Sequence, residues 1–316
     1  MASQLSSGDL LADRRYRYAE ACLADGDHAG AADLAEQALE RAPRYLPAWL
    51  LLGRARAGLA ASGTDPALRD AAAQAYARAL DIDPEDRLGV RAHLVRLGGG
   101  DTLPVLSPAY VRALFDDYAP RFERHLVEGL GYVGLQLVRD ALPRAPERFA
   151  VALDLGCGTG LMGRGRARPG RSSHRDRPLP PGMLALARTK TARGRPLYER
   201  LVEGDVAAAL ADLPEASADL CLAADVLIYV ADLASFLAGV GRVLRPGGLG
   251  AFTVQSHDGP GSVLGEDGRY AHADAHLAAT AAVSGLERLA ARPAEVRREG
   301  GRPVPGRVVV LRRTSA

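Results

Sequence analysis

The residues best suited to chemistry form a short run in which an acid is followed by three glycines. Residues 151–160 read VALDLGCGTG, so an apolar run ends at Asp154, and the glycines take alternate positions: Gly156, Gly158 and Gly160. This pattern predicts a buried strand that ends in a tight loop. Alternate glycines let a backbone approach a ligand closely, because they lack a Cβ and tolerate positive φ. The apolar stretch from Leu161 then predicts a helix whose N-terminal amides face the same ligand.

The acid and the glycine spacing narrow the class of ligand. A carboxylate repels a pyrophosphate but pairs with an ammonium group, so Asp154 argues against a dinucleotide. The nicotinamide fingerprint also requires a glycine at the position that Leu161 occupies. The alternative interpretation is a tight turn between a strand and a helix in some other α/β protein.

With these residues the chain resembles the class I S-adenosylmethionine-dependent methyltransferases, whose first motif is an acid, an alternating glycine loop and the helix behind it. The resemblance implies a doubly wound, Rossmann-like α/β domain and S-adenosylmethionine as cofactor. It implies that the loop holds the methionine part of the cofactor and that the acid lies near its amino group. The residues assigned to cofactor binding in this motif are Asp154, Leu155, Gly156, Cys157, Gly158, Thr159 and Gly160.

A second set of cofactor residues is predicted after the loop. A helix is predicted to begin near Met183, which is assigned to the cofactor, and LVEGD at 201–205 is predicted as the third strand. The resemblance assigns Asp205, at the end of that strand, to the adenine amino group, with Gly204 and Val206 beside it. A lone aspartate in this position is more commonly the N-cap of a helix.

The fourth strand and its loop are predicted to carry the acceptor side of the site. ADLCLAADVLIYVADL predicts a strand at 219–223 and a loop after it. The resemblance places this edge beneath the transferring methyl group. Asp225 and Tyr229 are therefore expected to face the substrate as catalytic candidates, and Ala223 and Ala224 are expected to contact the cofactor.

The RVLRPGG turn is a second mark of the same family. It is predicted to join a helix at 233–244 to a fifth strand at 249–255. The tail is predicted to add a helix, a strand and a final strand, PVPGRVVVLRR, as the antiparallel end of the sheet. The resemblance covers residues 106–313 with one break.

The segment before the first strand is helical by period. Phe115, Tyr118, Phe122 and Leu126 recur on one face, which is consistent with an aromatic core stripe. The segment also resembles the cap that closes over the cofactor in many small-molecule methyltransferases, where aromatic and acidic side chains suit a sulfonium. On that interpretation Tyr118 binds the cofactor and His125 is a catalytic candidate.

The family pattern fails immediately after the glycine loop. The family places an acid for the ribose hydroxyls at the end of a second strand. Residues 163–181 instead read GRGRARPGRSSHRDRPLPP, with six arginines and four prolines, and no strand is predicted through them. Asp176 is the nearby acid, and we do not expect it to contact the ribose. Activity of this exact sequence is therefore expected to be impaired.

A change of reading frame would explain this composition. RSSHRDRPLP can be coded so that the same bases, read one position later, give GRLTGIDLSP, a strand that ends in an acid and joins directly to the in-frame PGMLALARTK. The hypothesis is a compensating pair of frame changes near Arg164 and Pro180, which sequencing of the genomic DNA tests. The alternatives are a basic nucleic-acid loop, which lacks interleaved aromatic residues, and an ordinary solvated loop.

Residues 1–100 are predicted to form helical repeats. GDHAGAADLAEQALERAP has the spacing of a tetratricopeptide unit, and a second unit follows it. The signature residues are Gly26, Ala31, Ala38 and Pro43, then Trp49, Leu52, Gly53, Ala72, Tyr76, Ala79 and Pro84. A capping helix is predicted at 88–97. Such an array either binds a protein partner or packs against the second domain.

Composition limits the class of protein. The 316 residues, with 47% hydrophobic residues and a net charge of +2, are typical of a soluble chain of two domains without a nucleic-acid partner. Three scattered cysteines indicate reduced thiols in the cytoplasm and no metal site. No signal peptide or membrane span is expected.

The predicted domains are 1–100, helical repeats; 101–145, linker and cap; and 146–316, the methyltransferase domain. The whole resembles bacterial methyltransferases with N-terminal tetratricopeptide repeats.

The expected reaction is methyl transfer from a sulfonium to an oxygen or nitrogen nucleophile of a small molecule, driven by positioning and desolvation. A base is required only where the nucleophile must lose a proton, and the histidine candidates are His125, His257 and His272. The alternatives are a non-catalytic interaction protein with a degenerate cofactor domain and, more weakly, a nicotinamide oxidoreductase. The acceptor itself is not specified, because variable loops build its pocket on a widely shared fold.

Overall fold

The computed structural model divides the chain into two compact units, with the boundary between Asp117 and Tyr118. It describes residues 6–62, 66–98, 105–124, 126, 131–143, 149–161, 181–192, 194–265, 267–299 and 301–315. His125, Asp176 and residues 163–180 lie outside the described residues, so what the sequence suggests for them stays a prediction.

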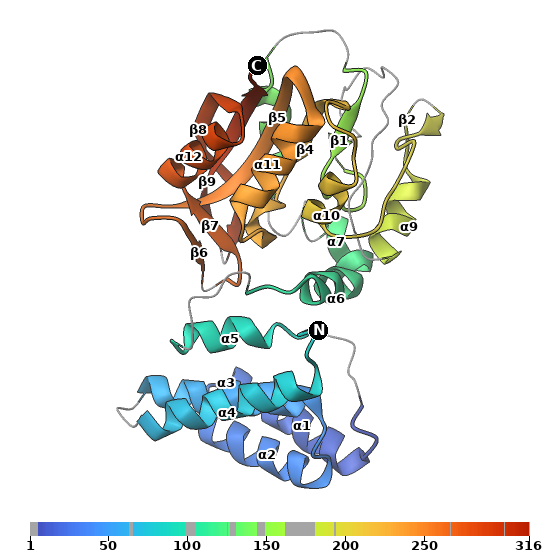
Figure 1. The fold of residues 1–316 in the computed structure, drawn as a ribbon. Coiled ribbons are helices and arrows are strands. Elements are labelled where there is room, and N and C mark those ends of the chain that lie inside the picture. Colours follow the sequence, from blue (N-terminus) through green and yellow to red (C-terminus); the bar gives the residue numbers. More distant parts are fainter. Residues whose placement is uncertain are drawn as a thin grey trace. The chain divides into compact units, whose positions relative to one another are not determined.

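The first unit is a series of helices joined by short turns. It contains α1 (Leu10–Ala24), α2 (His28–Arg41), α3 (Leu46–Ser62), α4 (Pro66–Ile82), α5 (Val90–Arg96) and nearly all of α6 (Pro108–Tyr118). From α1 to α5, each helix packs against the next in chain order (Figure 1). Gly26 turns the chain between α1 and α2 at a φ of 81°, a value that costs little without a Cβ. The helical character predicted for this part of the chain is confirmed.

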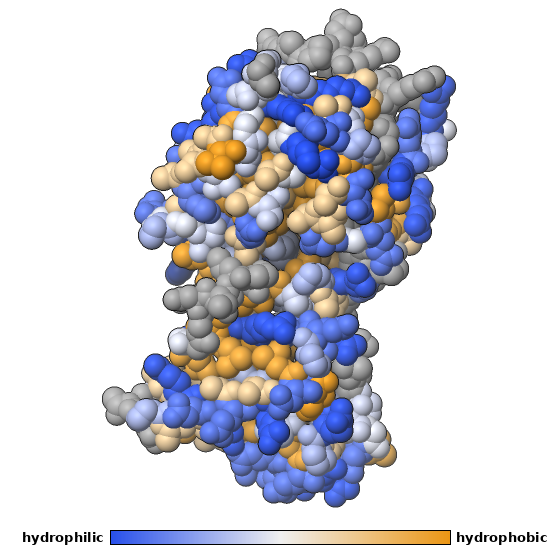
Figure 2. All heavy atoms as spheres, in the orientation of Figure 1, coloured by the Kyte–Doolittle hydropathy of each residue, from blue (hydrophilic) through white to orange (hydrophobic). Residues whose placement is uncertain are grey.

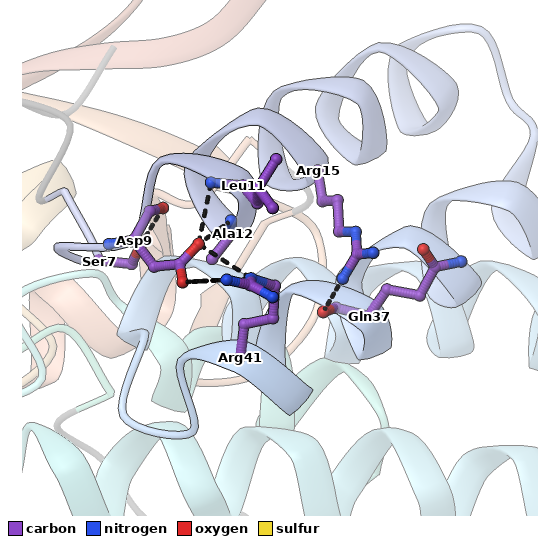
Figure 3. Close-up of polar contacts among 7 residues, drawn as sticks. All are labelled: Ser7, Asp9, Leu11, Ala12, Arg15, Gln37 and Arg41. Atoms are coloured by element: carbon purple, nitrogen blue, oxygen red, sulfur yellow. Dashed lines mark hydrogen bonds and ion pairs between the residues drawn. The ribbon is translucent and has the colours of Figure 1, made fainter.

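Asp9 caps α1 and joins it to α2 (Figure 3). Its Oδ1 accepts hydrogen bonds of 2.9 Å from the backbone N–H groups of Leu11 and Ala12. The Arg41 guanidinium approaches the same carboxylate, with Nη2 2.7 Å from Oδ2. The Arg41 hydrogen bond, followed by that of the Ala12 N–H group, lowers the pKa of Asp9 below its usual value. The Asp9 carboxylate thus caps α1 and also links α1 to α2 through Arg41.

Small residues form the contacts between these helices. Ala31 and Ala38 on α2 are fully buried, as are Ala72 and Ala79 on α4. Gly53 on α3 lies so close to the Tyr76 ring that any side chain at this position would overlap it. Figure 2 shows hydrophobic residues between α5 and the α3–α4 hairpin, bordered by hydrophilic ones.

The aromatic segment is a broken helix. α6 ends at Tyr118, and a 3-10 turn, η1 (Ala119–Arg121), and the short α7 (Phe122–Arg124) follow it. Pro120 lies in the first turn of η1 and has no N–H group with which to continue the α-helical hydrogen bonds. The helical character predicted for this segment is confirmed in α6 and α7, and Pro120 interrupts the α-helix between them.

The second unit contains a mixed sheet. β1 (Ala152–Asp154), β4 (Ala218–Ala223) and β5 (Leu244–His257) are parallel neighbours in that order. The long C-terminal strands β8 (Leu286–Glu299) and β9 (Arg302–Arg313) extend it, with β9 antiparallel to both β5 and β8. β7 (Tyr270–Ala273) pairs with the end of β5 and with β6 (Ser262–Leu264). The predicted fourth and fifth strands and the antiparallel tail are confirmed.

Helices cover both faces of this sheet. α10 (Val206–Ala211), α11 (Leu233–Val243) and α12 (Asp274–Val283) share one core with Leu153 and Cys221 of the sheet. α8 (Gly134–Ala141) packs on the opposite face, against Ala152, Leu220 and Leu222. Adjacent strand residues contribute to opposite cores, because side chains alternate along a strand. None of the described helices combines the length and the apolar character needed to cross a bilayer.

The predicted third strand is wrong. Residues 201–205 do not form a strand, and Asp205 is instead the N-cap of α10. In a doubly wound sheet the third strand pairs only with the second, and among the described residues β1 has no strand on the side away from β4. The chain after α9 (Pro181–Thr189) forms a separate hairpin of β2 (Thr191–Ala192) and β3 (Arg195–Pro196).

Candidate cofactor and acceptor site

Asp154 ends β1 as a buried carboxylate. Only 2% of the residue is exposed, and its Oδ2 accepts a 2.8 Å hydrogen bond from the Tyr198 hydroxyl. Burial raises the pKa of Asp154 to about 7, and the Tyr198 hydrogen bond opposes this rise. The group is thus poised between its neutral and ionised forms near neutral pH, and a cation placed beside it favours the ionised form.

The glycine loop has the backbone that its sequence predicts. Gly156, Gly158 and Gly160 have φ values of 82°, 59° and 88°, in the region that favours glycine. A Cβ at Gly156 would lie 2.6 Å from Cγ2 of Val226, which follows β4. Leu155 N–H donates to Leu222 O at 2.7 Å and holds the start of the loop against β4. The loop therefore lies at the carboxyl end of the parallel strands, where open α/β sheets bind their ligands.

Aromatic and basic side chains surround the rest of the loop. The Phe122 ring is 3.3 Å from where a Gly158 Cβ would lie, and Phe122 packs edge-on against Tyr118 with the ring centroids 5.4 Å apart. A Cβ added at Gly160 would lie 3.1 Å from Cγ of Lys190 and 3.2 Å from Cε2 of Tyr198. The predicted cap residue Tyr118 thus reaches the loop through Phe122, and sequence reasoning did not anticipate Lys190 or Tyr198.

Thr159 carries an unsatisfied polar atom within this loop. Its Oγ1 is fully buried, with no hydrogen-bond partner among the described residues. A buried hydroxyl without a partner costs about 1–3 kcal/mol, so such a group in a ligand loop points to a ligand or a water. Cys157 beside it is buried, and its thiol contacts Gly158 O.

Asp225, after β4, occupies a strained position. Its φ is 59°, uncommon for a residue other than glycine, and its N–H donates to the Thr253 hydroxyl at 2.7 Å. Arg297 Nη1 on β8 donates to Asp225 Oδ1 at 2.8 Å. Burial raises the pKa of Asp225, and the charge of Arg297 opposes that rise. Strain of this kind persists only where neighbouring contacts hold it, as Thr253 and Arg297 do here.

Arg297 links several groups at this edge of the sheet. The residue is only 2% exposed, and its Nη2 donates to Gln255 Oε1 at 2.7 Å and lies 3.5 Å from Asp267 Oδ2. Tyr229, in the 3-10 turn η4 (Leu227–Tyr229), hydrogen-bonds Arg269, and burial raises its pKa. The charges of Asp225 and Asp154 add to the effect of burial in raising the pKa of Tyr132 well above its usual value. The ends of β1 and β4 and these aromatic hydroxyls therefore share one polar region.

His257 and His272, two of the three histidine candidates, have structural roles. His272 is buried, with Nδ1 2.8 Å from the Ser262 hydroxyl and Nε2 2.9 Å from Leu227 O. Burial lowers the pKa of His272 to about 4, so it stays neutral at pH 7. Both ring nitrogens of His257 bond within its own loop, to Gly259 N–H and Gly261 O. Neither His257 nor His272 is poised to accept a proton from a ligand.

The other residues assigned to the cofactor lie on α9, at the start of α10 and at the end of β4. Asp205 is exposed, and its carboxylate accepts from the N–H groups of Ala207 and Ala208 as the α10 cap. Met183 is buried within α9, and Val206 is buried in the core beneath α10. Ala223 is buried at the end of β4. Ala224 is half-buried beside it, and Gly204 precedes the cap with a φ of 145°. Their roles toward a cofactor stay predictions.

The described residues fit one end of S-adenosylmethionine better than the other. An acid, three glycines with positive φ and the unpartnered Thr159 hydroxyl suit the amino-acid end of the cofactor. For the ribose, no described carboxylate follows a second strand next to β1. The described residues therefore match the methionine end of the cofactor and not the ribose.

Comparison with known proteins gives the class of this domain. Residues 153–252 match the family model described as a methyltransferase domain. The chain is 39% identical over 103 residues to malonyl-[acyl-carrier protein] O-methyltransferase of Serratia marcescens. The matched region covers 32% of this chain and 37% of that protein. The chain thus spans little more than a third of this curated relative.

Solved structures show the same fold. The 1,6-didemethyltoxoflavin-N1-methyltransferase of Burkholderia thailandensis, solved with S-adenosylhomocysteine, has a TM-score of 0.50 and 20% identity over 68% of this chain and 94% of that one. The [4+2]-cyclase SpnF has a TM-score of 0.50 and 18% identity, over 65% and 97% of the two chains. At these identities the likeness concerns the fold alone. The chain therefore carries an S-adenosylmethionine-dependent methyltransferase domain with a Rossmann-like fold, as predicted.

Proposed function

We propose that the whole protein transfers a methyl group from S-adenosylmethionine to an oxygen or nitrogen atom of a small molecule. The observation that carries this proposal is the buried Asp154 carboxylate beside three glycines of positive φ, at the carboxyl end of parallel strands. The match of residues 153–252 to the methyltransferase domain supports the same assignment. The free thiols of Cys22, Cys157 and Cys221 support a cytoplasmic location.

In this proposal, the groups at the carboxyl end of β1 bind the cofactor. When bound, S-adenosylmethionine supplies an electrophilic methyl group. Asp154 pairs through Oδ1 with an ammonium group while Oδ2 keeps the Tyr198 hydrogen bond. The loop from Leu155 to Gly160 presents its backbone to the same ligand, and the Tyr118–Phe122 pair excludes water above Gly158.

Asp225 and Tyr229 orient the acceptor in this proposal. Asp225 Oδ1 is held by Arg297, which leaves Oδ2 to accept a proton from a nucleophile that carries one. A carboxyl group with a raised pKa is better matched to that transfer near neutral pH. His125 stays a candidate from the sequence. Asp205, with Gly204 and Val206 beside it, is assigned to the adenine, and Met183, Ala223 and Ala224 are assigned to the cofactor without a specified part.

The names of the related proteins support a small acceptor with an oxygen or nitrogen nucleophile. The Serratia marcescens relative is an O-methyltransferase of a malonyl group carried on a protein, and the Burkholderia thailandensis enzyme is an N-methyltransferase of a small molecule. An acceptor carboxylate would need no base, whereas a protonated nitrogen or hydroxyl would.

We also propose that the first unit is a pair of tetratricopeptide-type repeats with a capping helix, open to a protein partner. The buried alanines of α2 and α4, the Gly26 turn and the close contact of Gly53 with Tyr76 support this proposal. α5 corresponds to the predicted cap helix.

A specific observation favours a second candidate, a non-catalytic interaction protein. Lys190 and Tyr198 pack against Gly160, and Tyr198 binds the carboxylate that the ammonium group requires. Under this candidate the chain fills its own cofactor site and the helical repeats carry the function.

Titration calorimetry with S-adenosylhomocysteine separates these candidates, with NADH as the control ligand. Saturable binding that Asp154→Asn weakens about tenfold or more supports the methyltransferase, because a charged hydrogen-bond partner is lost. The matched control is Asp219→Asn, which changes an acid on β4 that pairs with Arg245. Absence of binding by a folded chain supports the second candidate, and binding of NADH alone overturns both.

A further inference from the structure

The first unit contains a cavity that the proposed function does not use. It has a volume of about 350 Å³ and lies among α3, α4 and α5. Cavities that bind small molecules begin at about 300 Å³. Every described lining residue belongs to the helical unit.

The charge of this cavity has one sign. Arg54 on α3, Arg69 on α4 and Arg96 on α5 line it, and none of the described lining residues is acidic. Arg54 and Arg69 form no ion pair or side-chain hydrogen bond with any residue that the structure describes. Elsewhere in the same unit, arginines pair with carboxylates: Arg41, Arg56, Arg78, Arg87 and Arg91. The guanidinium groups of Arg54 and Arg69, which have no described counter-charge, favour binding of an anion.

Aromatic and small side chains complete the lining. Tyr76 and His93 stack with centroids 5.5 Å apart and an angle of 23° between their planes. Burial, followed by the positive charges of Arg96 and Arg54, lowers the pKa of His93 to about 4. The imidazole is therefore neutral at pH 7. Alanines of α3 form an apolar wall beside the arginines.

We propose that this cavity binds a small phosphate-bearing molecule, with Arg54, Arg69 and Arg96 around the phosphate and its organic part against the alanines and the Tyr76–His93 stack. Guanidinium groups form paired hydrogen bonds with both phosphate and carboxylate oxygens, and a site with three of them favours phosphate because it carries more negative charge and more acceptor oxygens than a single carboxylate. The mixture of a cationic rim and an apolar wall favours a phosphorylated organic molecule over free phosphate.

Calorimetry on the full chain tests the proposal with three probes: inorganic phosphate, pyrophosphate and phenyl phosphate. Saturable binding is expected, tightest for phenyl phosphate because the apolar wall contributes, and tighter binding of inorganic phosphate or pyrophosphate would overturn the organic part of the proposal. The double variant Arg54→Ala/Arg69→Ala is expected to lose about tenfold or more in affinity for each probe. The matched control is Arg78→Ala, which removes an exposed α4 arginine that does not line the cavity.

A second readout locates the binding. NMR titration of the His93 imidazole is expected to show its pKa rising when a phosphate probe is bound, because a nearby anion favours the charged ring. The double variant is expected to show no such change. The proposal is overturned if no probe binds saturably in the millimolar range, or if the double variant binds as tightly as the Arg78→Ala control. It is also overturned if the His93 titration stays the same with probe bound.

Discussion

Tyr198 and Asp154 lie 44 positions apart in the chain, and the Tyr198 hydroxyl donates a 2.8 Å hydrogen bond to Oδ2 of Asp154. The bond joins the segment after β3 to the end of β1. The Lys190–Glu123 ion pair, at 2.5 Å, joins the residue before β2 to α7. The hairpin is thus tied to the loop that the methyltransferase proposal assigns to the cofactor.

Replacing Tyr198 by Phe removes this donor and keeps the ring. Hydrogen bonds to charged groups contribute about 1.5–3 kcal/mol, so Tyr198→Phe is expected to lower the free energy of unfolding by that amount at pH 8. At pH 5, where Asp154 is neutral, the expected loss is smaller. Urea denaturation at both pH values measures the difference, and equal losses would contradict the assigned ionisation of Asp154.

The raised pKa of Asp154 predicts how stability depends on pH. The folded value is about 7 and the ordinary value is 3.8, so the folded state binds a proton that the unfolded state has released between these two values. The contribution of this group to stability is fully present below about pH 4 and is lost as the pH rises to about 7. Asp154→Asn is expected to remove this decline in a series of urea denaturations. A variant that declines as steeply as the wild type would show that another group titrates.

The approach of Val226 to Gly156 predicts a large effect of a single methyl group. Gly156→Ala combines a positive φ with a Cβ 2.6 Å from Val226 Cγ2 and is expected to cost more than the roughly 1–3 kcal/mol of strain alone. Gly194→Ala is the matched control, with a φ of 76° and no atom within 4 Å of the new Cβ. Thermal unfolding compares the two. Val226→Ala is expected to recover part of the loss in Gly156→Ala but none of it in Gly194→Ala.

The buried Arg297–Asp225 pair predicts a coupling between residues far apart in sequence. Arg297→Ala leaves Asp225 without its counter-charge and is expected to destabilise the protein by about 3–5 kcal/mol. Asp225→Asn in the same chain removes the unpaired charge, so the double variant is expected to be more stable than Arg297→Ala alone. Chemical denaturation of the four proteins in this cycle gives the coupling energy. A value near zero would mean that the two side chains act independently.

Asp205 allows its two assigned roles to be separated. Asp205→Ala removes the α10 cap and is expected to cost about 0.5–2 kcal/mol, whereas Asp205→Ser keeps a capping oxygen and most of the stability. If Asp205 also binds adenine, Asp205→Ser is expected to weaken S-adenosylhomocysteine binding in a chain of nearly wild-type stability. Unchanged affinity would leave Asp205 as a helix cap alone.

Local signals account for what sequence reasoning predicted correctly. Apolar runs predicted β4 and β5, helical periodicity predicted α1 to α5, and alternate glycines predicted a loop with positive φ. Each of these signals lies within a few consecutive residues, as do the backbone preferences that produce it. The third strand failed at LVEGD because a strand needs a paired neighbour, which its own residues do not provide.

By itself, the sequence determined the class of the second domain and the loop on which its cofactor proposal rests, because motif and backbone conformation are both local. Tertiary structure alone placed Tyr198 on Asp154, Arg297 on Asp225, and three arginines from different helices around one cavity. Arg297 and Asp225 are 72 positions apart. Such pairings depend on how strands and helices pack. The number of residues between two side chains along the chain does not determine how far apart they lie in a packed core.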